Sequence, residues 1–288
     1  MRRAQDIAKD EQAMRTIMTL TSAFEGLSSM RISQIKNSVI ESQAFFADLW
    51  QMYNQLRVDK LFKYGRDEQA NTDGFIDKEL YIGITAEGGF SGDIDQRLVS
   101  IMLETYDPAK QDIIIVGHHG AMQLAQVNVQ FKKYFKLPKR DENINVAPLS
   151  EYIQQYRSTT VYFQSYKSLM TQEIKRVEVH AAVQEAGSMV DNSDDIISER
   201  NYIFEPSSYA VVAHLERTMV QISLSQMILE SKLAQYASRY RAMSAAKKLA
   251  IDTTSSLHTE YNRVRRSVAD QRLKETISGM KLVRSHEQ

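Results

Sequence analysis

The segment LESKLAQYASRYRAMSAAKKLAIDTTSSLHTEYNRVRRS, Leu229–Ser267, contains neither glycine nor proline, and the stretch without these helix breakers extends from Ser207 to Ser278. At about 1.5 Å per residue, some seventy helical residues would reach roughly 105 Å, about three times the diameter of a small domain. A helix of that length in water needs a partner to cover its apolar face. The rest of the chain must therefore supply a surface for this helix, or the helix must enter another protein.

The long segment carries a heptad pattern of apolar and small residues, which is typical of a coiled coil. Alanine, serine and threonine are frequent in its centre, and their small side chains let another helix approach closely. The seam positions, which alternate by three and four residues, are Leu233, Tyr236, Tyr240, Met243, Lys247, Ala250, Thr254, Leu257, Tyr261, Val264 and Val268.

The beginning of the chain predicts the partner helix. Residues 1–64 contain one helix breaker, Gly26, and apolar residues recur there at multiples of about three and a half. A polar stretch with turn-forming residues, Tyr64–Gly74, closes this helix. We therefore expect residues 1–64 and 207–284 to form an antiparallel coiled coil. An ordinary helical bundle is an equally open alternative.

The middle of the chain, residues 75–200, has the pattern of an inserted domain. Short apolar runs alternate with helix-like segments, which predicts a Rossmann-like α/β domain with an at least partly parallel sheet. The fold class expected is therefore α/β with long terminal helices. The predicted strands are Lys78–Thr85, Gln111–His119, Thr160–Ser168 and Glu173–Val183, and the predicted helices are Ile94–Tyr106 and Ala121–Phe135.

Charge and composition restrict the class of protein. The chain has 36 Lys and Arg against 36 Asp and Glu, but the long helix is locally basic between Lys232 and Lys274. It contains no cysteine, which excludes disulfides and thiolate chemistry. No apolar run approaches the roughly 20 residues that span a bilayer, and MRRAQDIAKDEQ is not a secretory signal. We expect the chain to meet a membrane only through partners.

The inserted domain shows a glycine-rich turn, ITAEGGFSGDID, at the end of its first predicted strand. Its spacing is not G-x-G-x-x-G, and Glu87, Asp93 and Asp95 would repel a phosphate. We interpret it as a turn that packs against a helix. No Walker-type phosphate loop occurs in the sequence.

No other catalytic or ligand-binding pattern emerges. His118 and His119 are adjacent, so on an extended segment they would point to opposite faces and not share a metal. The basic helix lacks an aromatic stacking platform, which disfavours nucleic acid and favours a solvated face or an acidic protein socket. We expect no catalytic residue, cofactor or metal in this chain.

Several motifs together resemble the γ subunit, the central stalk, of F-type ATP synthases. ITAEGGFSGDIDQRLV is similar to the family's I-T-S-D-R-G-L-x-G-G-x-N segment, and YIFEPSS to its Y-x-Y-E-P-S loop. VYFQSYKSLMTQE resembles the family's V-Y-x-x-Y-N-x-F strand pair. The long helix, through LSQMILESKLAQYASRYRAMSAAKKLA and LHTEYNRVRRSV, is similar to the family's C-terminal helix, and RTIMTLTSAF is a weaker N-terminal counterpart.

The resemblance implies a rotor. In that family the paired terminal helices turn inside a hexamer of α and β subunits, while the α/β domain sits with the ε subunit on the membrane ring of c subunits. The chain would couple ion translocation to ATP synthesis or hydrolysis without an active site of its own. It would bind no cofactor and no nucleic acid. It would lie peripherally on the cytoplasmic side of a bacterial plasma membrane.

The resemblance also assigns contact residues. Those matching positions near the β catch loops, or where the helices meet the hexamer, are Met18, Met243, Asn262, Arg265 and Arg266. Those matching positions that face the c ring are Tyr202, Phe204 and Glu205. Packing within the coiled coil is the alternative role for both methionines.

The chain departs from the family pattern, and other functions compete with the rotor. Arg266 replaces a glutamine of the family, while Asp93 and Asp95 replace a glycine and an asparagine. One alternative is a γ-like subunit of another F-type-like motor, and a second is a helical scaffold or adaptor that forms a homodimer. A third is a small nucleotide-binding enzyme that uses the turn Gly88–Asp95.

Overall fold

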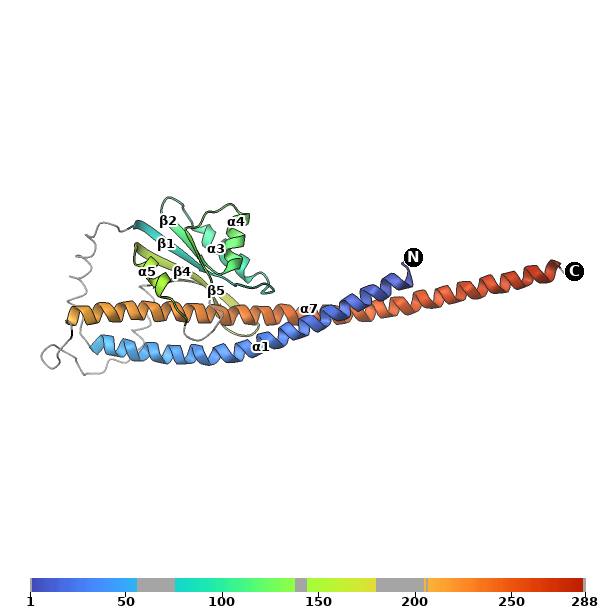
Figure 1. Cartoon of the computed structure of the whole chain (residues 1–288), viewed down its shortest axis with the longest axis horizontal. Helices are drawn as coiled ribbons and strands as arrows, with labels where there is room; N and C mark the ends of the chain where they lie inside the picture. The colour runs from blue at the N-terminus through green and yellow to red at the C-terminus, as the bar shows by residue number, and fades with distance from the viewer. Residues whose placement is uncertain (1, 56–75, 138–143, 180–204, 206, 287–288) are drawn as a thin grey trace. The chain divides into compact units, whose positions relative to one another are not determined.

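The computed structural model describes residues 2–55, 76–137, 144–179, 205 and 207–286. Two long helices, α1 (Ala4–Gln55) and α7 (Ser208–His286), flank an inserted α/β sheet in the sequence (Figure 1). The predicted fold class is thereby confirmed. Contacts divide the chain into two compact units, one of Met1–Leu27 with Arg241–Gln288 and one of Ser28–Tyr240. The three-part division at 1–64, 75–200 and 207–284 stays a prediction.

The sheet in the Ser28–Tyr240 unit is mixed, which agrees with the prediction of an at least partly parallel sheet. Its strands follow the order β3-β2-β1-β4-β5, with β1 at the centre and parallel to both β2 and β4. β3 is parallel to β2, while β5 returns antiparallel to β4. The strands are β1 (Ile76–Ile84), β2 (Gln111–Val116), β3 (Lys133–Phe135), β4 (Tyr156–Tyr166) and β5 (Gln172–Glu178).

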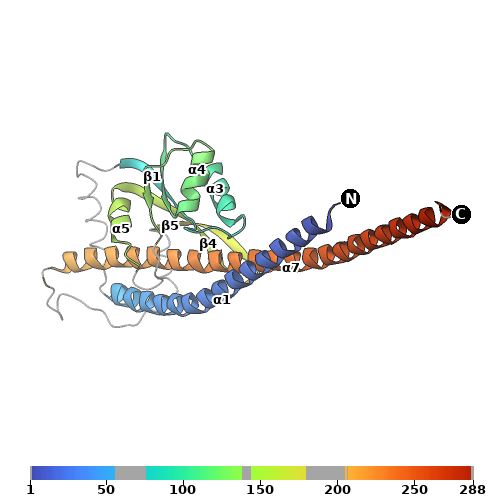
Figure 2. The same ribbon diagram turned by 45° about the vertical axis from the view of Figure 1, so that its right-hand side comes forward.

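Each face of this sheet is covered by different helices because side chains alternate along the strands. Tyr81, Ile113 and Ile115 pack against α3 (Ile94–Glu104) and α4 (His118–Gln126). Ile82, paired with Ile114 and Val161 on its neighbours, lies on the opposite face. That face packs against α5 (Ala147–Ile153) and against Leu224, Met227 and Ile228 of α7 (Figures 1 and 2).

In the same unit, α7 also buries a second face against α1. Ile35 of α1 is fully buried in a cluster with Leu229 and Leu233 of α7. Ile228, which packs towards the sheet, and Leu229, which packs towards α1, are neighbours in the sequence. This part of α7 is thus buried from two sides, which its heptad pattern predicted for one side only.

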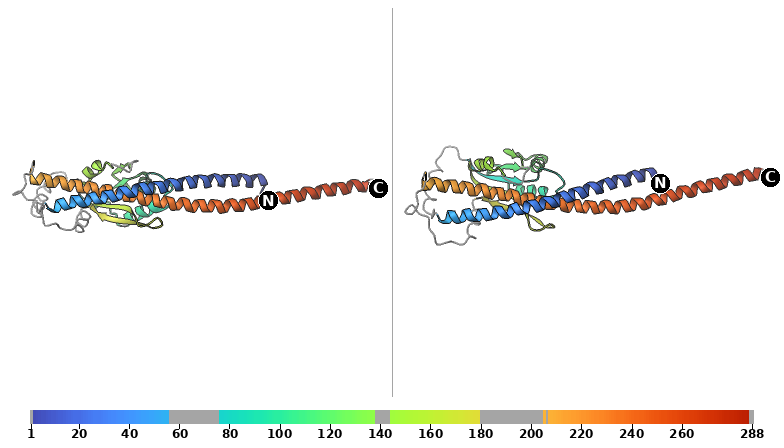
Figure 3. Two further views of the ribbon diagram at one scale, coloured as in Figure 1. Left: turned by 90° about the horizontal axis from the view of Figure 1, so that it is seen from below. Right: turned by 60° about the horizontal axis from the view of Figure 1, so that its bottom comes forward.

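The unit of Met1–Leu27 with Arg241–Gln288 contains an antiparallel pairing of the same two helices. Lys247 Nζ lies 2.9 Å from Glu25 Oε2, and His258 Nδ1 lies 3.5 Å from Glu11 Oε1. From the first of these pairs to the second, the residue number rises in α7 and falls in α1, so the two helices are antiparallel. In this unit α7 continues past the beginning of α1 (Figure 3), and residues 268–280 are all exposed.

The boundaries of two predicted elements were wrong. The helix predicted for Ala121–Phe135 ends at Gln126, because Asn128 adopts a φ of +56° and the chain then enters β3. The strand predicted for Gln111–His119 ends at Val116. Gly117 follows with a φ of +100°, and a Cβ there would lie 2.0 Å from the carbonyl oxygen of Thr85. Only glycine fits this close approach, which lets α4 begin at once.

We expect Ile82→Ala to lower the free energy of unfolding by about 2–5 kcal/mol, because it leaves a cavity between fully buried neighbours. Urea unfolding followed by near-ultraviolet circular dichroism measures this. The Tyr81 and Tyr162 rings, 5.2 Å apart in the core, report on the packing of this sheet. The control Val127→Ala, at a position 55% exposed, should change the free energy by less than about 0.5 kcal/mol. Equal effects of the two substitutions would contradict the assigned core.

Candidate functional site

The edge of the sheet at the carboxyl ends of β1 and β4 is the first place to look for a site. The chain proceeds from β1 to β2 and β3 on one side, then returns to β4 on the other, so the strand order reverses between β1 and β4. Ligands of open α/β sheets bind at such switch points. In this chain, side chains of α7 reach that edge.

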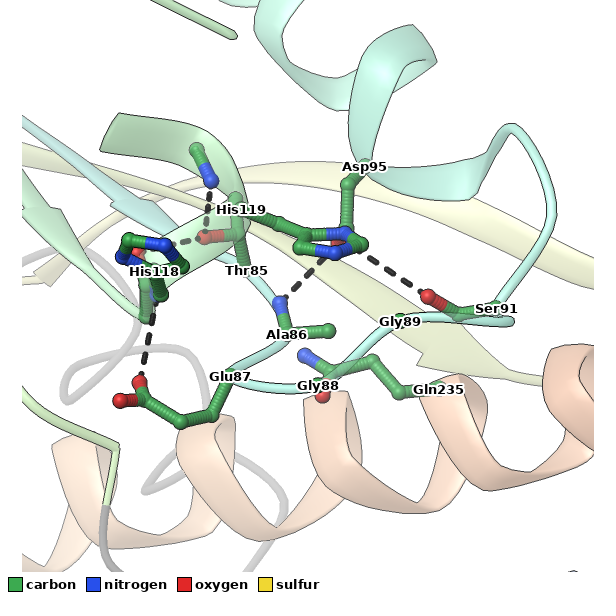
Figure 4. A network of polar contacts seen from close by, with 12 residues as sticks. Thr85, Ala86, Glu87, Gly88, Gly89, Ser91, Asp95, His118, His119 and Gln235 are labelled. Atoms are coloured by element: carbon green, nitrogen blue, oxygen red, sulfur yellow. Dashed lines mark hydrogen bonds and ion pairs between the residues drawn. The ribbon is translucent and has the colours of Figure 1, made fainter. Parts of the chain in front are cut away.

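Asp95, in the first turn of α3, lies at the centre of a buried polar network (Figure 4). The residue is 1% exposed, and its carboxylate accepts hydrogen bonds from the Ala86 amide at 3.2 Å and from Gln164 Nε2 at 2.7 Å. The Ser91 hydroxyl at 3.4 Å and His119 Nδ1 at 3.2 Å complete its surroundings. A carboxylate in this position also complements the positive end of the α3 dipole.

Helix α7 takes part in the same network. The side-chain oxygen of Gln164, in β4, accepts hydrogen bonds from the Ser231 hydroxyl and from Gln235 Nε2, the latter at 3.2 Å. Gln235 also donates to the Ser231 hydroxyl at 3.0 Å. One turn further along α7, Ser238 donates to the backbone carbonyl of Ser91 at 2.7 Å.

The glycine-rich turn after β1 is bound by α7 as well. Arg239 donates from Nε to the Gly89 carbonyl at 3.0 Å and from Nη2 to the Gly88 carbonyl at 3.2 Å. Its guanidinium lies over the Tyr236 ring, 5.2 Å from the centroid. The prediction that this turn packs against a helix is confirmed. The carbonyls of Gly88 and Gly89, in the turn that a nucleotide-binding enzyme would use, are engaged by the protein itself.

The two adjacent histidines open α4 instead of lying on an extended strand, which corrects the geometry assumed from the sequence. His119 contacts Asp95, whereas the His118 backbone amide donates to Glu87 Oε2 at 3.2 Å (Figure 4). Glu87 also accepts a hydrogen bond from Tyr134 at 2.9 Å. Burial, together with the Glu87 carboxylate, raises the pKa of Tyr134 to about 12. Among the described residues, no group of three or more potential ligands is arranged to hold a metal ion.

The predicted contact residues of the coiled coil lie in the unit of Met1–Leu27 with Arg241–Gln288. Arg265 and Arg266 are exposed and Asn262 is half-buried, all within a short stretch of α7. Met18 is half-buried, while Met243 is only 7% exposed.

The predicted foot residues are only partly described. Tyr202 and Phe204 lie outside the described residues, and Glu205 is exposed. The structure therefore gives no arrangement for this group of three.

Two features of the structure were not predicted from the sequence. The network around Gln164 was overlooked because serine and glutamine on a helix usually mark a solvated face. The second feature is an apolar stripe near the end of α7, where Leu273, Ile277 and Met280 are 61%, 46% and 64% exposed at spacings of four and three. The spacing of these residues by four and three is visible in the sequence and could have predicted the stripe.

Over the part of the chain that the structure describes, no helix combines the length and apolar character needed to cross a bilayer.

Comparison with known proteins gives a consistent result along the whole chain. A family model described as ATP synthase matches residues 3–283. The ATP synthase gamma chain of Mycoplasmoides gallisepticum is 24% identical over 290 residues, covering 96% of this chain and 98% of the relative. The gamma chain of Rickettsia conorii is 22% identical, covering 94% and 97%.

Solved structures of chains from ATP synthases share the fold. A chain of the Euglena gracilis mitochondrial ATP synthase, from its OSCP, F1 and c-ring assembly, superposes with a TM-score of 0.56 at 15% identity. That match covers 93% of this chain and 97% of the solved one. A chain from the central stalk and c-ring of the Tetrahymena thermophila enzyme gives the same TM-score and identity, covering 79% and 99%.

We expect the pair of His119 and Asp95 to make stability depend on pH. The hydrogen bond to Asp95 raises the pKa of His119, although burial and the positive charge of Arg239 oppose this. The folded pKa therefore lies above the unfolded value of about 6.5. The stabilisation is fully present below that unfolded value and is lost as the pH rises through the folded pKa.

His119→Gln should flatten this decline, measured as the free energy of unfolding in urea at a series of pH values from about 5.5 to 8.5. The control His118→Gln should leave the decline in place, since only the backbone of His118 is used in the network. Parallel curves for the wild type and His119→Gln would show that the pair does not act this way.

Proposed function

Because this chain belongs to the ATP synthase gamma chain family, as the central-stalk subunit of an F-type enzyme, we propose that it transmits torque between an ion-driven ring and a catalytic hexamer. The hexamer would consist of α and β subunits and the ring of c subunits. In this role the chain couples ion translocation to ATP synthesis or hydrolysis. It transmits the rotation, while the bonds of ATP are made and broken on other chains.

The observation that carries this proposal is the unpaired end of α7. Its apolar stripe of Leu273, Ile277 and Met280 faces no other segment of its own unit among the described residues, and residues 268–280 are exposed throughout. Burying such a stripe in a partner removes apolar surface from water, which drives association. A sleeve formed by the hexamer around the helix end would cover it on all sides.

The charged residues just before this stripe are proposed to contact the β subunits. Arg265 and Arg266 are exposed and free to form charge-assisted hydrogen bonds, and Asn262 lies on the same short stretch. Met18 and Met243 are proposed to lie where the helices meet the hexamer. The burial of Met243 supports a contribution through packing of the helix pair.

The predicted foot residues are proposed to face the membrane ring. Tyr202, Phe204 and the exposed Glu205 would contact the c subunits, with the ε subunit beside the α/β sheet. The chain would then be held peripherally at the cytoplasmic side of a bacterial plasma membrane by its partners.

Native mass spectrometry of the complex, purified from source membranes through a tag on this chain, tests the proposed assembly. We expect one copy of this chain with three α and three β subunits, and ATP hydrolysis by the same sample. A homodimer of this chain without ATPase subunits would instead establish the scaffold alternative. An ATPase hexamer without c subunits would favour a γ-like part of another motor.

Arg265→Glu should lower the ATP hydrolysis rate of the assembled complex by about tenfold, because a charge-assisted contact to β is replaced by repulsion. The matched control is Arg263→Glu, at another exposed position of the same helix. Hydrolysis is measured at saturating ATP, after mass spectrometry has verified that each variant assembles. Equal rates for the two variants would contradict a specific contact at Arg265.

A further inference from the structure

The contacts between α7 and the sheet are of two kinds, apolar and polar, which differ in how strictly they fix the rotation and axial position of the helix. Leu224, Met227 and Ile228 make apolar contacts with the sheet. Such contacts are not directional, so they fix the rotation of the helix and its position along its axis less strictly than hydrogen bonds do. Further along, from Glu230 to Arg239, hydrogen bonds and an ion pair are added to the apolar contacts.

These polar contacts form a group that we call the polar clamp. They reach three separate parts of the sheet with its connections, residues 76–137 and 144–179, which we call the sheet unit. Ser231 and Gln235 bind Gln164 of β4, and Ser238 and Arg239 bind the turn after β1. Glu230 accepts a hydrogen bond from Ser165 of β4 at 2.5 Å and pairs with Lys175 of β5 at 3.5 Å. The members of the polar clamp are Glu230, Ser231, Gln235, Ser238 and Arg239 of α7 with Gln164, Ser165, Lys175 and the Gly88–Ser91 turn.

The clamp is buried at its centre. If α7 moved along or around its axis relative to the sheet, no water would replace the hydrogen-bond partners that were lost. Gln164 and Ser231 are fully buried, and Gln235 and Ser238 are 4% and 1% exposed. One residue of slip moves a helix by about 1.5 Å and turns its side chains by about 100°. Each buried hydrogen bond lost in this way shifts the equilibrium against the slipped arrangement by roughly fivefold or more.

Gln164 is the point where the clamp connects to the rest of the sheet unit. Its amide nitrogen donates to Asp95 of α3 while its oxygen accepts from α7, so one side chain joins β4, α3 and α7. Asp95 in turn accepts from the Ala86 amide, which ties the clamp to the end of the central strand. A force that turns α7 is thus opposed by directional bonds anchored in the middle of the sheet.

We propose that the polar clamp fixes the register of α7 on the sheet and carries torque between them, so that its members are positioning residues for energy coupling. This inference rests on the proposed function, because torque passes through this junction only if the sheet unit is driven by the ring. Loss of the clamp lets the sheet unit and α7 slip past each other under load. ATP hydrolysis then continues while ion transport per ATP falls.

The experiment uses the whole complex in inverted membrane vesicles. The ATP hydrolysis rate and the ATP-driven response of a membrane-potential dye are measured together, since the dye reports transport of any coupling cation. The ratio of dye response to hydrolysis is the coupling ratio. We expect Ser231→Ala with Gln235→Leu to reduce this ratio to less than about half while hydrolysis is retained. Leu224→Ala, which weakens only apolar contact, should lower thermal stability and preserve the ratio.

A charge exchange provides a second, independent readout. Glu230→Lys and Lys175→Glu should each lower the coupling ratio, and the two together should restore it because the ion pair re-forms with its charges reversed. This rescue decides the question even if the variant lacking Ser231 and Gln235 fails to assemble. A coupling ratio unchanged in the assembled clamp variant, or single exchanges that the double exchange does not rescue, would overturn the proposal. Wild-type vesicles that hydrolyse ATP without this chain in the complex would instead overturn the proposed function.

Discussion

The structure depends on one constraint: the apolar side chains of α7 must be covered by other parts of the protein over much of the helix. Between Leu224 and Leu233 it is covered twice, by the sheet on one side and by Ile35 of α1 on another. Beyond Arg241 it pairs with the beginning of α1 through Lys247 and Glu25. The last turns of α7 are exposed and have no such cover among the described residues. The covered part of the helix therefore contributes to packing within the chain, and the exposed part is available for contacts with other chains.

The sheet unit binds α7 at the edge where its strand order alone would suggest a small-molecule site. An open α/β sheet with this order offers a switch point where many proteins bind a small molecule. Here the carboxylate of Asp95 and the amide of Gln164 direct their hydrogen bonds to protein groups, including Ser231 and Gln235. Buried polar groups satisfied within the chain give a unique alignment that apolar contact does not.

Much of this fold was predictable from the sequence because its strongest signals are long or repetitive. The heptad pattern predicted α7, and the apolar periodicity at the beginning of the chain, with Gly26 as its one helix breaker, predicted α1. The end of α4 was missed because Asn128 in a left-handed conformation stops a helix that the apolar spacing alone would continue. The Gln164 network was missed because an amide in a strand and a serine in a helix, some 67 residues apart, give no local pattern. The outward roles of Arg265 and Glu205 depend on other chains, so this chain alone does not fix them.

The separation in sequence between the two paired helices has a consequence for biosynthesis. Ile35 leaves the ribosome long before Leu229 and Leu233, the residues that bury it. At about 5–20 residues per second, the intervening segment of roughly 190 residues takes about 10–40 seconds to be made. During that interval the apolar side of α1 has no partner from its own chain. The nascent protein therefore presents a long uncovered surface to the cell's chaperones, and its folding is completed only after translation has almost finished.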